Sequence, residues 1–433
     1  MSAEQVEPVS PSPSAPKKTS TLRRVLGALG PGVVTGAADD DPSGIATYSV
    51  AGAQLGTSLL WTAMFTWPMM AAVQTMCARI GMVTGEGLSR ALSQKFPRWV
   101  LVIASVALLA ANTINVGADL AGMADAAAML TGLNSHYFVV FFGIAIACGT
   151  VWLPYARLAG VLKWLALSLF AYVLTAFLVG IDWATVIRAA LIPSMPVGQA
   201  GWATLVAILG TTISPYLFYW QASCEVEEEK SMGRARLSTR LGATPTELLD
   251  RKIDVGAGTF FSNIVMFFII LTTASTLHRH GVTNIETSRQ AAEALAPLAG
   301  RFAATIYTIG IFGVGALAIP TLTGSAAYAL AETFNWRQGL GEKLSGAHRF
   351  YAVVLLSTIV GVALDFAHVN PVRALFWTAV INGVLAPFLL TGILIVASDE
   401  NIMQQQPSSM LSRCVVGLTA LVMFGAAIAM LVL

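Results

Sequence analysis

A series of long apolar segments constrains this chain more than any other feature of its sequence. A helix needs about 20 apolar residues to cross a bilayer, and each segment is near that length. Only 11% of the residues are charged, whereas a soluble domain has roughly 25%. We therefore expect an all-α polytopic membrane protein with the lipid bilayer as its surroundings. The expected spans are residues 23–55, 58–81, 99–130, 136–154, 158–181, 201–224, 253–277, 301–332, 349–367, 372–397 and 411–433.

The rest of the composition excludes several partners. The net charge is +2 and the basic residues form no patch, so we expect no nucleic acid. The four cysteines are scattered and form no C-x-x-C pair, which argues against a disulfide or a cysteine metal site. Residues 1–21 are rich in proline and serine, which is typical of a disordered tail, and residues 22–433 form the predicted transmembrane domain.

Lysine and arginine predict the orientation, because short cytoplasmic loops carry more of them. They are concentrated in the N-terminal tail and after the second, fourth, sixth and eighth spans, and the polar linker 225–252 carries six of them. We expect a multi-pass protein of the plasma (inner) membrane. Its N-terminal tail is predicted to be cytoplasmic and its C-terminus to lie outside.

Two spans contain polar residues and a proline. The first is interrupted at 39–44 by "DDDPSG", and the sixth at 210–221 by "GTTISPYLFYWQ". The interruptions occupy the same place in two successive sets of five spans. Paired broken helices of this kind indicate an inverted-repeat transporter with its substrate near the midplane. The repeats are predicted at about 22–181 and 200–397, with an extra helix at about 411–433.

The interruptions would present oxygen ligands. Pro42 and Pro215 each remove a helical donor, which leaves the carbonyls of Ala38 and Thr211 without their helical partners. Oxygen is the ligand that Mg²⁺, Ca²⁺ and Mn²⁺ accept. The side chains expected to contribute are Asp41, Ser43, Thr212, Ser214 and Tyr216.

Two structural alternatives compete with a cation site. A proline kink with neighbouring hydroxyls often satisfies its own backbone groups in membrane helices. The three aspartates would instead lie at the membrane surface if the first helix ended there, but apolar residues flank them on both sides. A carboxylate at a helix centre costs about 2.5–3.5 kcal/mol, so some of the three must reach water or a cation.

Several stretches resemble the Nramp family (solute carrier family 11). They include "GPGVVTGAADDDPSGIATYSVAGAQLG", "ILGTTISPYLFYWQAS" and "TLTGSAAYALAETF". The resemblance covers about residues 22–430. It implies a LeuT-like fold of five and five helices, with helices 1 and 6 broken and an eleventh helix added. It also implies transport of divalent transition metals, usually together with protons.

The residues that differ from the family pattern bear on the choice of ion. The family's asparagine after Asp-Pro is replaced, since Ser43 and Gly44 follow the pair here. Its methionine, a soft ligand that favours Mn²⁺ and Fe²⁺, is Ser214. Two histidines of the sixth span are Tyr216 and Gln221.

The third span differs as well. An aspartate of the family's proton route is kept as Asp119, whereas two glutamates are replaced by Gly122 and Asn112. Such replacements remove groups that exchange protons, so we expect no proton coupling. The pattern resembles the Nramp-related magnesium transporters, a divergent branch of the family.

We therefore expect Mg²⁺ to be carried by alternating access as a partly hydrated ion, with Mn²⁺ tolerated. Mg²⁺ usually keeps several waters in proteins, and a site without the amide and the thioether would be wider. Asp39 and Asp40 are expected to accept hydrogen bonds from those waters. The transported ion apart, we expect no cofactor, and we expect a monomeric transport unit.

Some alternatives remain open at this point. Asn382 either contributes an amide oxygen to the site or bonds a neighbouring helix. Asp119 is either a retained acid on the ion's route or a partner for a nearby polar group. An ordinary proton-coupled Mn²⁺/Fe²⁺ symporter is the main functional alternative. A sodium-coupled amino-acid carrier, a membrane-embedded enzyme and a metal sensor fit the residues less well, and we expect no enzyme.

Overall fold

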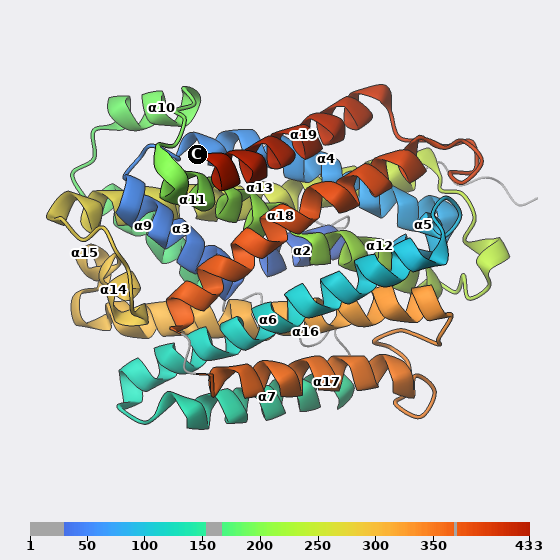
Figure 1. The fold of residues 1–433 in the computed structure, drawn as a ribbon, viewed down its shortest axis with the longest axis horizontal. Coiled ribbons are helices and arrows are strands. Elements are labelled where there is room, and N and C mark those ends of the chain that lie inside the picture. Colours follow the sequence, from blue (N-terminus) through green and yellow to red (C-terminus); the bar gives the residue numbers. More distant parts are fainter. Residues whose placement is uncertain (1–29, 153–166, 368–369) are drawn as a thin grey trace, which may run out of the picture.

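A computed structural model describes residues 30–152, 167–367 and 370–433, and in these ranges the regular elements are helices (Figure 1). The predicted disordered tail, residues 1–21, lies outside the described ranges, as do residues 158–166 of the fifth predicted span. Eight helical segments of the described ranges are long and apolar enough to cross a membrane. The prediction of a polytopic helical membrane protein is confirmed.

The first predicted span is two half-helices, α2 (Pro31–Asp39) and α3 (Pro42–Leu55). The next three spans are the helices α4 (Trp61–Thr84), α6 (Arg98–Thr131) and α7 (Ser135–Trp152). The described part of the fifth is η1 (Leu167–Leu169) and α9 (Phe170–Leu178).

The second set of spans begins with another pair of half-helices, α11 (Gly198–Thr212) and α12 (Pro215–Ser231). It continues with α13 (Pro245–Thr276), α16 (Ala303–Phe334), α17 (His348–Asp365) and α18 (Pro371–Ser398). The helix α19 (Met410–Val432) follows both sets. Short connecting helices are α5 (Leu88–Leu92), α10 (Trp183–Leu191), η2 (Leu237–Thr239), η3 (His278–His280), α14 (Ser288–Glu293), α15 (Ala296–Ala299) and η4 (Gly300–Phe302).

Each interruption is centred on the residue before a proline. A residue in that position is disfavoured in the helical region, and both have extended backbones: ψ is 172° at Asp41 and 134° at Ser214. Pro42 and Pro215 then occupy first-turn positions of α3 and α12, where a missing N–H costs nothing. The same local rule therefore breaks both helices.

Glycines bring the half-helices into direct backbone contact with the second set of spans. A Cβ at Gly36 of α2 would lie 2.4 Å from the carbonyl carbon of Gly258 on α13. A Cβ at Gly210 of α11 would lie 2.0 Å from the carbonyl oxygen of Ala379 on α18. Small residues permit such approaches between membrane helices, so the two interruptions are held at the centre of the bundle.

The bundle has two ends. At one, called here the α2 end, α2 and α13 begin and α12 finishes; at the other, called the α3 end, α3 finishes and α11 begins. Figure 1 shows α2 and α12 extending from the centre to one side and α3 and α11 to the other. The interruptions lie between them.

Candidate cation site

The two interruptions meet through hydrogen bonds. The hydroxyl of Tyr216 on α12 donates to the carbonyl oxygen of Ala38 on α2 at 3.0 Å. On the other side of the interruptions, the hydroxyls of Tyr48 on α3 and Thr212 on α11 lie 3.1 Å apart. The structure therefore brings together the two regions that the sequence predicted to meet.

The three consecutive aspartates face two different helices. Asp39 Oδ2 and Asp40 Oδ1 accept from the hydroxyl of Ser262 on α13, at 2.6 and 3.1 Å. Asp41 Oδ1 instead accepts from the backbone N–H of Gly44 at 2.7 Å, which makes Asp41 the N-cap of α3. All three side chains are buried. The "DDD" run therefore supplies two separate carboxylate groups.

Asp41 is joined to Asp119 through a single amide. Asn115 Nδ2 donates to Asp41 Oδ2 at 3.2 Å and to Asp119 Oδ2 at 3.1 Å. Asn115 and Asp119 are both completely buried and lie one turn apart on α6. Asp119 therefore has a nearby polar partner, which was one of the two roles considered for it. Because Asn115 also bonds Asp41, Asp119 belongs to the same hydrogen-bonded group as Asp41.

Several buried oxygens near the interruptions lack a hydrogen-bond partner among the residues that the structure describes. Unsatisfied buried polar atoms are rare in native proteins and often mark a missing water or ion. Carboxylate, amide and hydroxyl oxygens are the ligands that hard divalent cations select. The atoms are Asp39 Oδ1, Thr211 Oγ1, Asn115 Oδ1 and Asp119 Oδ1.

The two carbonyls predicted to lose their helical partners accept hydrogen bonds from side-chain hydroxyls instead. Ala38 O accepts from Tyr216, and Thr211 O accepts from the hydroxyl of Ser214 at 2.8 Å. Ser214 also lies 2.6 Å from the carbonyl oxygen of Gly210. Each carbonyl keeps a second lone pair, so these bonds leave room for one further contact to Ala38 O and Thr211 O. Ser43 lies at the start of α3 and is buried.

Gly44 is closely surrounded by neighbouring atoms. A Cβ at this position would lie 3.2 Å from Thr211 Oγ1, 3.3 Å from Asp39 O and 3.4 Å from Tyr48 Cε2. A side chain at this position would therefore begin in tight contact with its neighbours. The reason is the close approach of α3 to α11.

The remaining predicted pathway residues occupy different places. Gly122 is near the first interruption, since its Cβ would lie 3.8 Å from Pro42 Cβ and 3.0 Å from Leu375 Cδ1. Asn382 on α18 is buried, and its Oδ1 lacks a partner among the described residues.

Two others take part in bonds away from the interruptions. Asn112 Nδ2 donates to Leu322 O at 2.8 Å and to Ser325 Oγ at 2.9 Å, which joins α6 to α16. Gln221 Nε2 donates to Glu225 Oε1 at 2.6 Å on the same helix. Neither bond contacts the three aspartates.

Sequence reasoning missed two residues of this site. Asn115 lies in the third predicted span, one turn before Asp119, and that spacing is the signal that would have found it. Ser262 is a small polar residue within the apolar run of α13, where a serine is usually a packing residue. Only the folded structure shows that it faces two aspartates.

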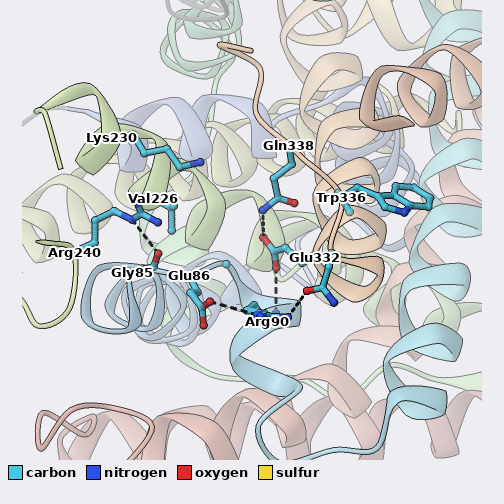
Figure 2. A pocket seen from close by; sticks show the side chains of 12 residues that line it. Gly85, Glu86, Arg90, Val226, Lys230, Arg240, Glu332, Trp336 and Gln338 are labelled. Atoms are coloured by element: carbon cyan, nitrogen blue, oxygen red, sulfur yellow. Dashed lines mark hydrogen bonds and ion pairs between the residues drawn. The ribbon is translucent and has the colours of Figure 1, made fainter. Parts of the chain in front are cut away.

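A different cavity, of about 270 Å³, lies at the α2 end between α12 and α16. Figure 2 shows its charged side chains turned toward protein partners: Arg240 toward Gly85 O, and Arg90 toward Glu86. Glu332 accepts from Gln338 and from the backbone N–H of Arg90. These charges brace the loops of the α2 end, and the cavity is separate from the aspartates.

Comparison with known proteins decides the family. Residues 32–433 match the family described as Nramp, natural resistance-associated macrophage protein-like. The chain belongs to the Nramp family. Members of this family are membrane transporters and not enzymes, and the Nramp chain described here is a multi-pass membrane protein.

Two relatives of this Nramp protein carry the name divalent metal cation transporter MntH. The one from Yersinia pestis (strain Pestoides F) is 27% identical over 314 residues, which is 70% of this chain and 73% of the relative. The one from Deinococcus radiodurans is 27% identical over 315 residues, which is 70% of this chain and 69% of the relative.

Solved structures show the fold. A manganese transporter from Eremococcus coleocola, in complex with an aromatic bis-isothiourea compound, has a TM-score of 0.72 at 15% identity over 96% of this chain and 95% of that chain. Mhp1 in an inward-facing conformation has a TM-score of 0.53 at 14% identity over 92% and 90%. The predicted LeuT-like fold, with five and five helices, two of them broken, and an eleventh helix, is confirmed.

Proposed function

We propose that this Nramp protein carries Mg²⁺ across the membrane by alternating access, with Mn²⁺ tolerated and without coupled protons. One observation carries the proposal: the buried atoms near the interruptions that lack a hydrogen-bond partner among the described residues are oxygens of carboxylate, amide and hydroxyl groups. Mg²⁺ and Mn²⁺ both accept such ligands. The relatives' name, divalent metal cation transporter, supports the broader class of substrate.

Asp41 is the proposed principal ligand. Its Oδ1 is occupied as a helix cap, so Oδ2, which faces Asn115, is the atom directed to the ion. Asp119 Oδ1, Asn115 Oδ1 and Thr211 Oγ1 are the proposed neighbours, directly or through the ion's waters. The remaining lone pairs of Ala38 O, Ser214 and Tyr216 are further candidates.

The preference for Mg²⁺ rests on ligand softness. Ser214 occupies the position where the family pattern has a methionine, and soft thioethers favour Mn²⁺ and Fe²⁺ over Mg²⁺. The closed space around Gly44 means that hydrated Mg²⁺ needs α3 and α11 to separate slightly when it binds. Asp39 and Asp40 are proposed to accept hydrogen bonds from the retained waters.

The absence of proton coupling rests on the third span. Gly122 and Asn112 cannot exchange protons, and Gly122 is packed against Leu375. Of the acids that form the proton route in the family pattern, this span keeps Asp119. We further propose a monomeric unit in the plasma (inner) membrane, with the α2 end cytoplasmic and the C-terminus outside, as the distribution of basic residues favours.

Proteoliposome flux tests the proposal. Mg²⁺ should compete with Mn²⁺ uptake, and Mn²⁺ entry should leave the lumenal pH unchanged. Failure of Mg²⁺ to compete contradicts the hard-ion argument, whereas lumenal acidification contradicts the loss of coupling. Metal-dependent thermal stabilisation without any flux indicates a sensor.

A proton-coupled Mn²⁺/Fe²⁺ symporter is the second candidate, and one observation favours it. Met266 on α13 lies close to the site, with its sulfur 3.7 Å from Thr212 Oγ1. A thioether there offers a soft contact that the interruptions themselves lack. If Met266→Leu abolishes Mn²⁺ transport but leaves Mg²⁺ transport intact, the thioether is a ligand and this candidate is preferred.

A further inference from the structure

The beginning of α2 is bonded to one carboxylate of α13. Asp254 accepts from the backbone N–H groups of Gly30 at 2.8 Å, Gly32 at 2.7 Å and Val33 at 3.1 Å. The first N–H groups of a helix have no partner within it and attract a negative charge. Asp254 thus caps α2 from a different helix, and it is completely buried.

Arg251 ties the same carboxylate to α12. Its Nη1 lies 2.6 Å from Asp254 Oδ2, and its Nε lies 2.7 Å from Glu225 Oε2. It also pairs with Glu228. Because Glu225 and Glu228 are on α12, Asp254 and Arg251 together connect both half-helices of the α2 end. We call these two residues the latch.

Beyond the latch, α2 and α13 stay in close backbone contact, and we call this contact the seam. A Cβ at Gly32 would lie 2.6 Å from the backbone nitrogen of Val255, and Gly36 is equally close to Gly258. The two helices are therefore in direct backbone contact at these glycines, and a cavity of about 280 Å³ lined by Gly36, Asp40 and Ser262 lies beside this contact. The half-helix closed in this way ends at Asp39, beside Asp40 and Asp41.

A cavity of about 540 Å³ lies at the α2 end, between the starts of α13 and α19, and the α3 end has a cavity as well. A cavity of about 500 Å³ lies there between α3, α11 and α18, lined by Gln54, Ala203 and Trp377 among others. Below it, the bond between Tyr48 and Thr212 closes the site. In the described structure, ion pairs hold the half-helices of the α2 end together, and the Tyr48–Thr212 contact lies between the α3-end cavity and the aspartates.

We propose that Asp254, oriented by Arg251, is a positioning residue that keeps α2 closed on α13, and that opening of the α2 end requires this latch to release. The latch would then set the balance between the two access states of the carrier. This goes beyond the proposed function, because it concerns which end opens and does not depend on the identity of the ion.

Cysteine accessibility without metal tests the latch. Thr35 on α2 is buried, so Thr35→Cys reports opening of the α2 end; Ala203 lines the opposite cavity, so Ala203→Cys reports the α3 end. Each is placed in a chain with the native cysteines changed to alanine, in Asp254→Asn and parent backgrounds. Modification by a membrane-impermeant thiol reagent is timed on detergent-solubilised full-length protein by intact mass. The native cysteines are Cys77, Cys148, Cys224 and Cys414.

Asp254→Asn should speed modification of Thr35→Cys about tenfold or more, the factor expected from the loss of one charge-assisted hydrogen bond, and should slow that of Ala203→Cys. Asp399→Asn, which removes an acid whose partner is Lys95 and not Arg251, is the matched control and should change neither rate. Opposite changes at the two ends distinguish release of α2 from general loosening, which would raise both.

Arg251→Lys keeps one positive charge but cannot hold three carboxylates, so it should shift both rates in the same directions by less. It carries the test alone if Asp254→Asn does not fold. The proposal is overturned if Thr35→Cys stays protected in the folded variants, or if both rates rise together.

Discussion

Asp41 accepts a hydrogen bond of 3.2 Å from Asn115, whose amide nitrogen also donates to Asp119. One side chain therefore sets the distance between two buried carboxylates on different helices. Groups that orient ion ligands typically change metal affinity by about 10- to 100-fold when they are removed. The amide of Asn115 is therefore expected to orient the two acids that it joins.

Asn115→Leu should accordingly raise the KM for Mn²⁺ and Mg²⁺ by about 10- to 100-fold. Leucine has a similar volume but leaves Asp41 Oδ2 and Asp119 Oδ2 without this donor. Proteoliposome uptake across a metal titration measures it. Asn112→Leu, on the same helix but bonded to α16, is the control, and it should lower thermal stability while leaving KM unchanged. Equal effects of the two variants on KM would show that Asn115 is only structural.

Asp41→Ala should abolish transport of both ions. The side chain caps α3 through Oδ1 and directs Oδ2, which also accepts from Asn115, at the proposed site, so no neighbour replaces it. Asp40→Asn should keep measurable flux at reduced affinity, because Asp40 bonds Ser262 on α13 and lies outside the group joined by Asn115. Parallel uptake of Mn²⁺ and Mg²⁺ compares the two. Normal flux in Asp41→Ala removes this residue from the mechanism.

Ser214→Met should shift the preference towards Mn²⁺, because it adds a soft thioether at the second interruption. The measured quantity is the Mg²⁺ concentration that halves Mn²⁺ uptake, which should rise about tenfold if the added ligand is worth about 1.4 kcal/mol. Ser214→Ala is the control, since it removes the hydroxyl that bonds Gly210 O and Thr211 O without adding sulfur. If the two variants behave alike, ligand softness at this position does not govern selectivity.

The broken helices were predictable because their cause is local. A proline fixes its own φ, removes a donor and extends the preceding residue, so Asp41–Pro42 and Ser214–Pro215 locate both interruptions from sequence alone. The apolar segments were equally readable, since crossing a bilayer sets their length.

The partners of the aspartates were not predictable, because they depend on how helices rotate against one another. Three adjacent carboxylates were expected to act in one place, yet Asp39 and Asp40 meet Ser262 whereas Asp41 meets Asn115. The latch was missed for the same reason. Glu225 and Glu228 pair with Arg251 from the polar linker, and this pairing depends on how α12 and α13 are placed relative to each other.

Gly36→Ala should destabilise the protein because it inserts a methyl group where two backbones touch. The added Cβ would lie 2.4 Å from the carbonyl of Gly258, closer than any real contact, so α2 must move away from α13. Overpacking of this kind costs about 1–3 kcal/mol, and thermal unfolding in detergent should show a lower midpoint.

Gly256→Ala is the matched control, since no atom lies within 4 Å of its added Cβ. That variant should unfold at the parent midpoint or slightly above it, because alanine is the better helix former. Equal midpoints for Gly36→Ala and the parent would mean that α2 is not held against α13 at this seam.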